Sequence, residues 1–412
     1  VALGAQRDER ARRVVGGGGR GVRRGGGGRA RPARVRERVR ERARERVEVH
    51  GFLTQGVARS DSLPIVGISR GGTADYRAAA LQGRIALPAG GAAVVQLASR
   101  RLGSSPLNAA TPVVTVQWAY LQRELPGDLT LKLGRAPMAR GIFNETRRVG
   151  TVLPFFRAPY LFYTESFETF DGAALTHATH AGAWRLVTSA YGGNVPYLQT
   201  APSVILRPEV ALVGGAPTVV GVAIARDTSV LMRRRGDRAI GVQGWLSTPV
   251  PGLRLGAGAM RFSLNDLHEL SGRVGRAPGS TVHGSVDGVF ARATLRGEWG
   301  QLRVGEFLYT AHYVQGGVRL TDRLALHVQR EGAAIRYVST LPIEGAPGTP
   351  LATTVVRGGG PFGRDVAVGA NWVVAPMAIL KLEAHANRGA NYDRWTGEAP
   401  TRYVIASVAL GF

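Results

Sequence analysis

The sequence predicts an all-β chain that forms a transmembrane antiparallel β-barrel of about 16 strands, with a range of about 14 to 18 strands allowed. Three observations support this fold class. Apolar and polar residues alternate with a period of two from Val47 onward, tight turns alternate with long polar connections, and the chain ends within a strand at Phe412. Because a strand in lipid must be paired along both edges, the last strand should pair with the first and close a barrel.

The final strand, 401–412, shows the alternation clearly. Counting back from Phe412, one face carries Leu410, Val408, Ala406 and Val404, and the other face carries mainly small or polar residues. Successive side chains of a strand point to opposite faces of the sheet. The same pattern occurs in 129–134, 313–320, 365–374 and 378–387. We expect the apolar faces, rich in Leu, Val and Ala, to contact lipid and the polar faces to line a water-filled lumen.

Composition supports many short strands and excludes several kinds of site. The 412 residues are 44% hydrophobic, yet no uninterrupted apolar run is long enough for a transmembrane helix. The 57 glycines and 22 prolines are typical of tight turns. The chain has no cysteine, which excludes disulfides, thiolate metal ligands and a cysteine nucleophile.

The connections between the predicted strands fall into two classes. Short turns rich in Pro and Gly are predicted at 88–91, 126–128, 181–182, 248–252, 299–301, 321–323 and 375–377. Longer polar loops are predicted at 58–73, 102–112, 136–167, 192–238, 265–284 and 339–364. Short periplasmic turns and long extracellular loops are typical of bacterial outer-membrane barrels, and an even number of strands returns both termini to the periplasmic side.

Aromatic residues cluster near the predicted strand ends. In an outer-membrane barrel such residues form girdles at the two membrane interfaces. The alternative is that they are ordinary core aromatics. The residues concerned are Trp118, Tyr120, Trp184, Tyr191, Trp245, Trp299, Phe307, Tyr309, Trp372, Tyr403 and Phe412.

Residues 1–46 differ in composition from residues 47–412, so we treat them as separate segments. They contain 16 Arg and five acidic residues, and supply +11 of the net charge of +24. An arm that binds nucleic-acid phosphates and a short oligomerising helix are two alternatives. We predict instead a disordered Arg/Gly-rich leader, or upstream sequence misread as coding. An exported barrel needs a signal peptide, and no such apolar segment with a cleavage site precedes Val47.

Two stretches resemble Gram-negative porin-like outer-membrane proteins. The first, 50–56, reads His-Gly-Phe-Leu-Thr-Gln-Gly, and the second, 133–147, reads Leu-Gly-Arg-Ala-Pro-Met-Ala-Arg-Gly-Ile-Phe-Asn-Glu-Thr-Arg. Together with Asp171-Gly172, the resemblance covers about the first third of the barrel. It implies a passive channel in the bacterial outer membrane, with 136–167 as a loop folded toward the lumen. The last strand is similar to the final strand of outer-membrane barrels, so the barrel assembly machinery is an expected partner through Phe412.

The composition of the loop at 136–167 also suggests a role in selectivity, independently of the resemblance. It combines arginines with a few carboxylates and many aromatic residues, and such a cationic excess at a constriction would favour anions. For Asn144 and Glu145, a structural role in shaping the loop has slightly more support than a role in ion selectivity. The predicted constriction residues are Arg135, Arg140, Asn144, Glu145, Arg147, Arg148 and Arg157.

Strand alternation predicts which side chains line the lumen. We expect Leu131, Val368, Leu380 and Leu382 to face lipid. The predicted pore-lining residues are Arg84, Lys132, Arg185, Arg254, Arg303, Arg319, Lys381 and Glu383. Because cations outnumber acids in this set, the pore should prefer anions modestly, and the preference should fade as salt rises unless the loop narrows the lumen.

Other functions have weaker support in the sequence. His177 and His180 lie three apart near a strand and make a poor metal pair, and no catalytic motif occurs, so we expect no metal, no cofactor and no enzyme activity. An outer-membrane hydrolase remains an alternative, since the sequence does not show which serine and histidine side chains are neighbours in space. A specific transporter would normally need a globular plug, which 46 Arg/Gly-rich residues cannot form. Nucleic-acid binding is the least supported. The expected partners are outer-membrane lipid and small solutes or anions, and a homo-oligomer is compatible with the sequence.

Overall fold

The computed structural model describes residues 47–412 except 111–112, 214–215, 269–273, 347–348 and 390–399. The predicted leader, 1–46, lies outside the described residues. The described residues belong to one compact unit, Arg46–Phe412.

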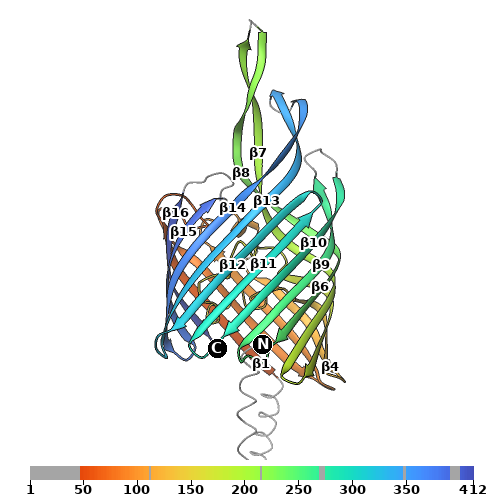
Figure 1. Ribbon diagram of the computed structural model, residues 1–412, viewed down its shortest axis with the longest axis vertical. Helices are drawn as coiled ribbons and strands as arrows, with labels where there is room; N and C mark the ends of the chain where they lie inside the picture. Colours follow the sequence, from red (N-terminus) through yellow and green to blue (C-terminus); the bar gives the residue numbers. More distant parts are fainter. Residues whose placement is uncertain (1–46, 111–112, 214–215, 269–273, 347–348, 390–399) are drawn as a thin grey trace, which may run out of the picture. The chain divides into compact units, whose positions relative to one another are not determined.

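Sixteen antiparallel strands form one closed barrel, which confirms the predicted fold class (Figure 1). Each strand pairs with its neighbours in sequence, and a four-residue helix, α3 (Leu107–Ala110), follows β3. The strands are β1 (Val47–Ser60), β2 (Thr73–Leu87), β3 (Gly91–Leu102), β4 (Thr115–Leu125), β5 (Leu129–Pro137), β6 (Thr169–Ala181), β7 (Trp184–Val213), β8 (Ala216–Ser247), β9 (Leu253–His268), β10 (Val274–Val289), β11 (Ala293–Val304), β12 (Phe307–Arg319), β13 (Leu324–Ala346), β14 (Thr349–Ala375), β15 (Ala378–Gly389) and β16 (Thr401–Gly411). No helix in the described part of the chain is long and apolar enough to cross a membrane.

The barrel closes where β16 pairs with β1, as the terminal strand predicts. The register runs from Phe52 opposite Gly411 to Ser60 opposite Tyr403. Beyond it, the amide of Gly51 donates to the Phe412 carbonyl, and the Phe412 amide donates to the Gly51 carbonyl, both at 3.0 Å. This pairing leaves the end of the chain without an open strand edge, which would be costly in lipid.

The barrel has two different ends, which we call the turn rim and the loop rim. The turn rim carries the short connections 88–90, 126–128, 182–183, 248–252, 290–292, 320–323 and 376–377. The predicted turn at 299–301 is wrong, because these residues lie inside β11, and the turn at 290–292 takes its place. Gly300 serves a different purpose: a Cβ there would lie 3.1 Å from the Phe162 ring, so glycine makes room for that ring.

Three of the predicted loops are largely strands. Residues 192–238 extend β7 and β8 into a paired hairpin above the loop rim, residues 339–364 extend β13 and β14, and residues 265–284 belong mostly to β9 and β10 (Figure 1). The prolines of 192–238 suggested a loop from sequence. Beyond Asn194, however, β7 pairs with β8 on one side only. A proline whose nitrogen faces such an open edge removes no ladder hydrogen bond.

Exposure alternates along the strands as the sequence predicts. On β14 and β15, Val368 and Leu382 are 54% and 61% exposed, whereas Lys381 and Glu383 are only 3% and 2% exposed. The barrel therefore has an apolar outer face and a polar inner face. The aromatic residues do not all form girdles: Trp184, Trp299, Trp372 and Phe412 are exposed on the outer face, but Trp118, Tyr120, Tyr191 and Tyr403 are buried inside.

We expect Leu382→Arg to destabilise the barrel in a bilayer by about 2–4 kcal/mol, because a lipid-facing cation near mid-membrane must be desolvated. Leu382→Met, which keeps an apolar side chain, is the matched control and should change little. The measurement is the free energy of unfolding in urea with the protein in vesicles. Equal stability of the two variants would show that this face does not contact lipid.

Candidate constriction site

The connection between β5 and β6, Met138 to Glu168, folds into the barrel. We call it the inner loop; it matches the predicted loop at 136–167 closely. Its aromatic side chains are buried against aromatic residues of the inner wall. The group comprises Phe143, Phe156, Tyr160, Phe162 and Tyr163 of the inner loop with Tyr76, Tyr313 and Tyr403 of the strands. Burial of these large rings inside the barrel favours the inward path of the loop.

Three inward carboxylates hold the backbone of the inner loop. Glu298 on β11 accepts the amide of Ile142 at 3.0 Å, and Glu331 on β13 accepts the amide of Leu161 at 2.9 Å. Glu383 on β15 accepts the amide of Phe156 at 2.5 Å. The inner loop has no regular secondary structure, so its buried amides need such acceptors.

Lys381 and Glu383 point inward as predicted, but they do not line open water. The Lys381 ammonium donates to the carbonyls of Leu153 at 2.5 Å and Phe155 at 3.1 Å. The expectation that Lys381 faces water is therefore wrong, because the inner loop covers this side chain. Strand alternation predicts only that a side chain points into the barrel. It does not predict whether a loop packed inside the barrel covers that side chain.

Glycine and asparagine give the inner loop its shape. Gly141 has φ of +62°, and a Cβ there would lie 2.5 Å from both a Glu298 carboxylate oxygen and the Tyr163 hydroxyl. The Asn144 amide donates to the carbonyls of Met138 at 2.8 Å and Glu168 at 3.0 Å, which ties the two ends of the loop together. This is the structural role weighed for Asn144. Glu145 is exposed and makes no ion pair within the described residues.

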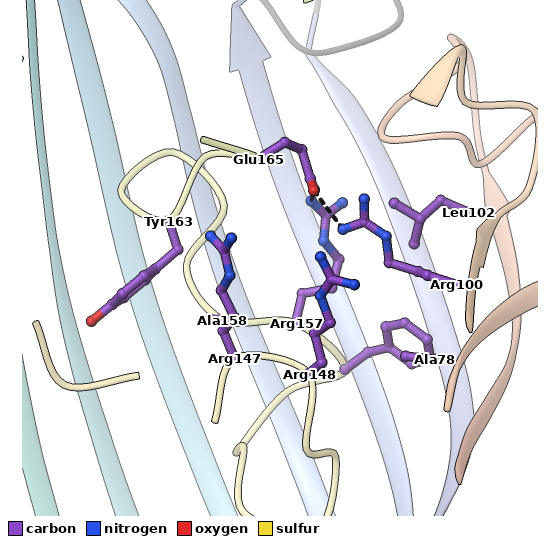
Figure 2. A pocket seen from close by; sticks show the side chains of 10 residues that line it. Ala78, Arg100, Leu102, Arg147, Arg148, Arg157, Ala158, Tyr163 and Glu165 are labelled. Atoms are coloured by element: carbon purple, nitrogen blue, oxygen red, sulfur yellow. Dashed lines mark ion pairs between the residues drawn. The ribbon is translucent and has the colours of Figure 1, made fainter. Parts of the chain in front are cut away.

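Four arginines gather between the inner loop and the wall formed by β2 and β3 (Figure 2). Arg100 of β3 pairs with Glu165 at 2.6 Å, and Arg157 lies 3.7 Å from the same carboxylate. Arg147 pairs with Glu168 at 2.9 Å, and Arg148 pairs with it as well. We call these six residues the arginine cluster. It has two more cations than anions, and its arginines and Glu165 line a small cavity together with Ala78 and Leu102.

The surroundings keep the arginine cluster charged. Burial alone would raise the pKa of Glu168, but Arg147 and Arg148 lower that pKa to about 2. Arg100 and Arg157 likewise outweigh burial at Glu165 and lower its pKa. Burial lowers the pKa of Arg148 to about 10, which leaves the guanidinium protonated near neutral pH.

The link between the arginines and Glu168 should therefore resist acid. A carboxylate with a depressed pKa contributes its full stabilisation above its unfolded pKa, about 4.5, and loses that stabilisation as the pH falls through about 2. Reversal potentials depend on the charge of the folded channel, so we expect the contribution of Glu168 to them to stay constant from about pH 7 to about pH 4 and to change only as the pH approaches about 2. Glu168→Gln, which lacks the titrating group, should show less change in that acid range. A transition near neutral pH that Glu168→Gln abolishes would contradict the assignment.

The remaining predicted constriction residues lie in two places. Arg140 donates to the Phe162 carbonyl at 3.1 Å and lies over the Phe162 ring, so it belongs to the packed interior of the inner loop. Arg135 was predicted to lie at the constriction, but it is on the outer face of β5 and pairs with Asp171 at 2.7 Å. The reason is the alternation itself, since its neighbour Ala136 is buried on the inner side.

The other predicted pore-lining residues lie mostly toward the turn rim. Arg84 is 3.3 Å from Glu48, Lys132 lies over the Tyr120 ring, and Arg254 pairs with Asp287 at 2.7 Å. Arg185 is exposed one residue from the end of β7, and Arg319 donates to the Ala291 carbonyl beside a turn. The prediction that Arg303 lines the pore is wrong. Its neighbours Leu302 and Val304 pack against the inner core, so Arg303 points outward.

Sequence reasoning did not select Arg100, Glu298 or Glu331. Arg100 could have been found, because Val94, Gln96 and Ala98 on the same strand are buried, and alternation places Arg100 with them. The anchoring roles of Glu298 and Glu331 had no such signal. They depend on the path of a loop more than 130 residues away in sequence.

Comparison with known proteins gives a result for the fold alone. No protein-family model matches the chain, and no curated protein matches its sequence. Among solved structures, OmpF of Salmonella typhi, in complex with daunomycin, matches 89% of this chain and 97% of its own at 10% identity, with a TM-score of 0.54. An anion-selective porin of Comamonas acidovorans matches 89% of this chain and 99% of its own at 10% identity, with a TM-score of 0.51. Outer-membrane-expressed OmpT of Vibrio cholerae matches 89% of this chain and 97% of its own at 10% identity, with a TM-score of 0.51. The chain thus shares its barrel fold with these proteins of the bacterial outer membrane.

Proposed function

We propose that this protein is an outer-membrane channel through which small solutes diffuse passively, with a preference for anions. The observation that carries the proposal is the arginine cluster, placed between the inner loop and the wall of a closed barrel with an apolar outer face. Solutes would pass beside the wall of β2 and β3, next to the ion pair that Arg100 forms with Glu165 of the inner loop.

The outer face of the barrel supports insertion into a membrane. Among its exposed side chains are Val57, Leu121, Leu295 and Val314, each more than half exposed. A soluble protein rarely exposes so continuous an apolar surface. Every strand has at least nine residues, the length that a tilted strand needs to cross the hydrocarbon core. The fold shared with outer-membrane proteins agrees with that location.

The narrowing by the inner loop bears on selectivity. Salt screens charges over about 8–10 Å, so a wide lumen would lose its preference at physiological ionic strength. An ion that passes between the inner loop and β3 comes closer than that to the guanidinium groups. We therefore infer that the anion preference persists at higher salt. The likeness to an anion-selective porin is consistent with this inference.

Planar-bilayer recording of the refolded chain tests the proposal. We expect stepwise conductance increases and, in a potassium chloride gradient, a reversal potential of the sign for anions. Absence of steps from protein shown to be folded would refute the channel. A reversal potential of the opposite sign would refute the anion preference and leave the channel standing.

A further inference from the structure

Six arginines point outward on six neighbouring strands near the loop rim. We call them the arginine arc: Arg364 (β14), Arg388 (β15), Arg402 (β16), Arg59 (β1), Arg77 (β2) and Arg101 (β3). Each alternates with buried residues of the inner face, such as Asp365, Asn387 and Tyr403. The arc therefore belongs to the same outer surface as the exposed leucines and valines.

The arginine arc lies at a defined height on the barrel. Its members are nine to twelve residues from the turn-rim ends of their strands. At about 3.3 Å per residue and a tilt of about 40°, ten residues rise about 25 Å, which is the height of the apolar band of such barrels. The arc therefore lies where the apolar band ends and lipid headgroups begin.

The two ends of these six strands differ strongly. In their turn-rim halves, the outward positions hold no charged residue and include Val49, Ile85, Trp372, Leu380 and Leu410. A genome-wide preference for arginine would not confine arginines to one height. The asymmetry indicates that the leaflet around the loop rim presents the opposite charge.

The register of the strands places like charges together. Arg364 lies directly opposite Arg388, and Arg77 lies directly opposite Arg101. Like charges directly opposite across strands destabilise a sheet. Asp75 pairs with Arg77 at 3.0 Å, but within the described residues no carboxylate pairs with Arg364, Arg388 or Arg101. Anions supplied from outside the chain would remove this repulsion.

We propose that the arginine arc binds a multiply phosphorylated lipid in the leaflet around the loop rim. The proposal rests on the membrane location in the proposed function but not on conduction. Guanidinium groups bind phosphate through two parallel hydrogen bonds. Because four of the six arginines form two directly opposite pairs, a lipid with two phosphates fits them better than one with a single phosphate.

Native mass spectrometry of the refolded full chain in detergent, titrated with bisphosphorylated lipid A, tests the proposal. One arginine near an anionic surface contributes about a factor of five, so Arg364→Gln, Arg388→Gln and Arg402→Gln together should weaken binding on the order of a hundred-fold. Arg123→Gln is the matched control, because Arg123 is exposed on the outer face of β4 near the turn rim, and it should bind as the wild type does. Heat-modifiable electrophoretic mobility shows whether each variant is folded.

The proposal is overturned if the folded triple variant binds lipid A as tightly as the wild type. It is also overturned if phosphatidylglycerol binds as tightly as lipid A, or if millimolar inorganic phosphate displaces the lipid. Reversal potentials of the triple variant should equal those of the wild type, since the arc faces away from the lumen. Lipid binding without conductance would refute the proposed function alone, and conductance without lipid binding would refute this inference alone.

Discussion

Replacing Glu298 by Ala should release the inner loop and raise single-channel conductance severalfold. The Glu298 carboxylate accepts hydrogen bonds from the Ile142 amide at 3.0 Å, the Tyr313 hydroxyl at 2.7 Å, the Ser285 hydroxyl at 2.5 Å and the Tyr163 hydroxyl. Two of these donors, Ile142 and Tyr163, belong to the inner loop. Each buried donor left without an acceptor costs about 1–3 kcal/mol, so the packed position of the loop should lose most of its advantage.

Glu306→Ala is the matched control for this experiment. Glu306 is an exposed carboxylate in the tight connection between β11 and β12, at the loop rim, close in sequence to Glu298. Its removal should leave the conductance unchanged. The measurement is the distribution of conductance steps in planar bilayers, together with current noise from loop motion. Wild-type conductance in a folded Glu298→Ala protein would mean that the other anchors suffice or that the loop does not limit the current.

Replacing Arg100 by Ser should lower the ratio of anion to cation permeability about twofold at low salt, since one charge at about 8 Å in water contributes about 0.5 kcal/mol. Arg100 is the member of the arginine cluster that the barrel wall supplies, and it pairs with Glu165 at 2.6 Å. Its loss reduces the cationic excess of the cluster from two to one. It also leaves Glu165 with Arg157, 3.7 Å away, as its remaining ion-pair partner in the cluster.

The next residue on the same strand provides the control. Arg101 has the same charge and lies on the outer face, opposite Arg77. Arg101→Ser should leave the reversal potential unchanged, although it belongs to the arginine arc and should weaken lipid binding. Equal shifts of the reversal potential in the two variants would show that long-range charge, and not the arginine cluster, sets the selectivity.

The sequence by itself determined the barrel, because the signals involved are local. A period of two along a strand assigns each side chain to a face without knowledge of its neighbours. This is why Leu382 and Lys381 lie on the predicted sides and why the strand that ends at Phe412 pairs with β1. The same rule was available for Arg303 and Arg135, whose neighbours in sequence show their outward direction.

Loop extents were less well predicted, for a physical reason. Pro and Gly disfavour a regular strand at their own positions. Residues 192–238 contain enough of both to suggest irregular structure. Pairing between β7 and β8 continues through this region, because an antiparallel hairpin with an open edge tolerates proline. Whether a polar segment pairs with itself depends on contacts between residues far apart in the chain.

Only the tertiary structure decided what the inner face does. Four polar side chains would suit a water-filled lumen from sequence alone: Glu298, Glu331, Lys381 and Glu383. In the structure they hydrogen-bond to the backbone of the inner loop and hold it in place. The arginine cluster likewise forms only when the inner loop brings Arg147, Arg148 and Arg157 beside Arg100. Alternation fixes direction within a strand, whereas the position of a loop depends on hydrogen bonds and packing with side chains of many strands. Those interactions exist only after the barrel has closed around the loop.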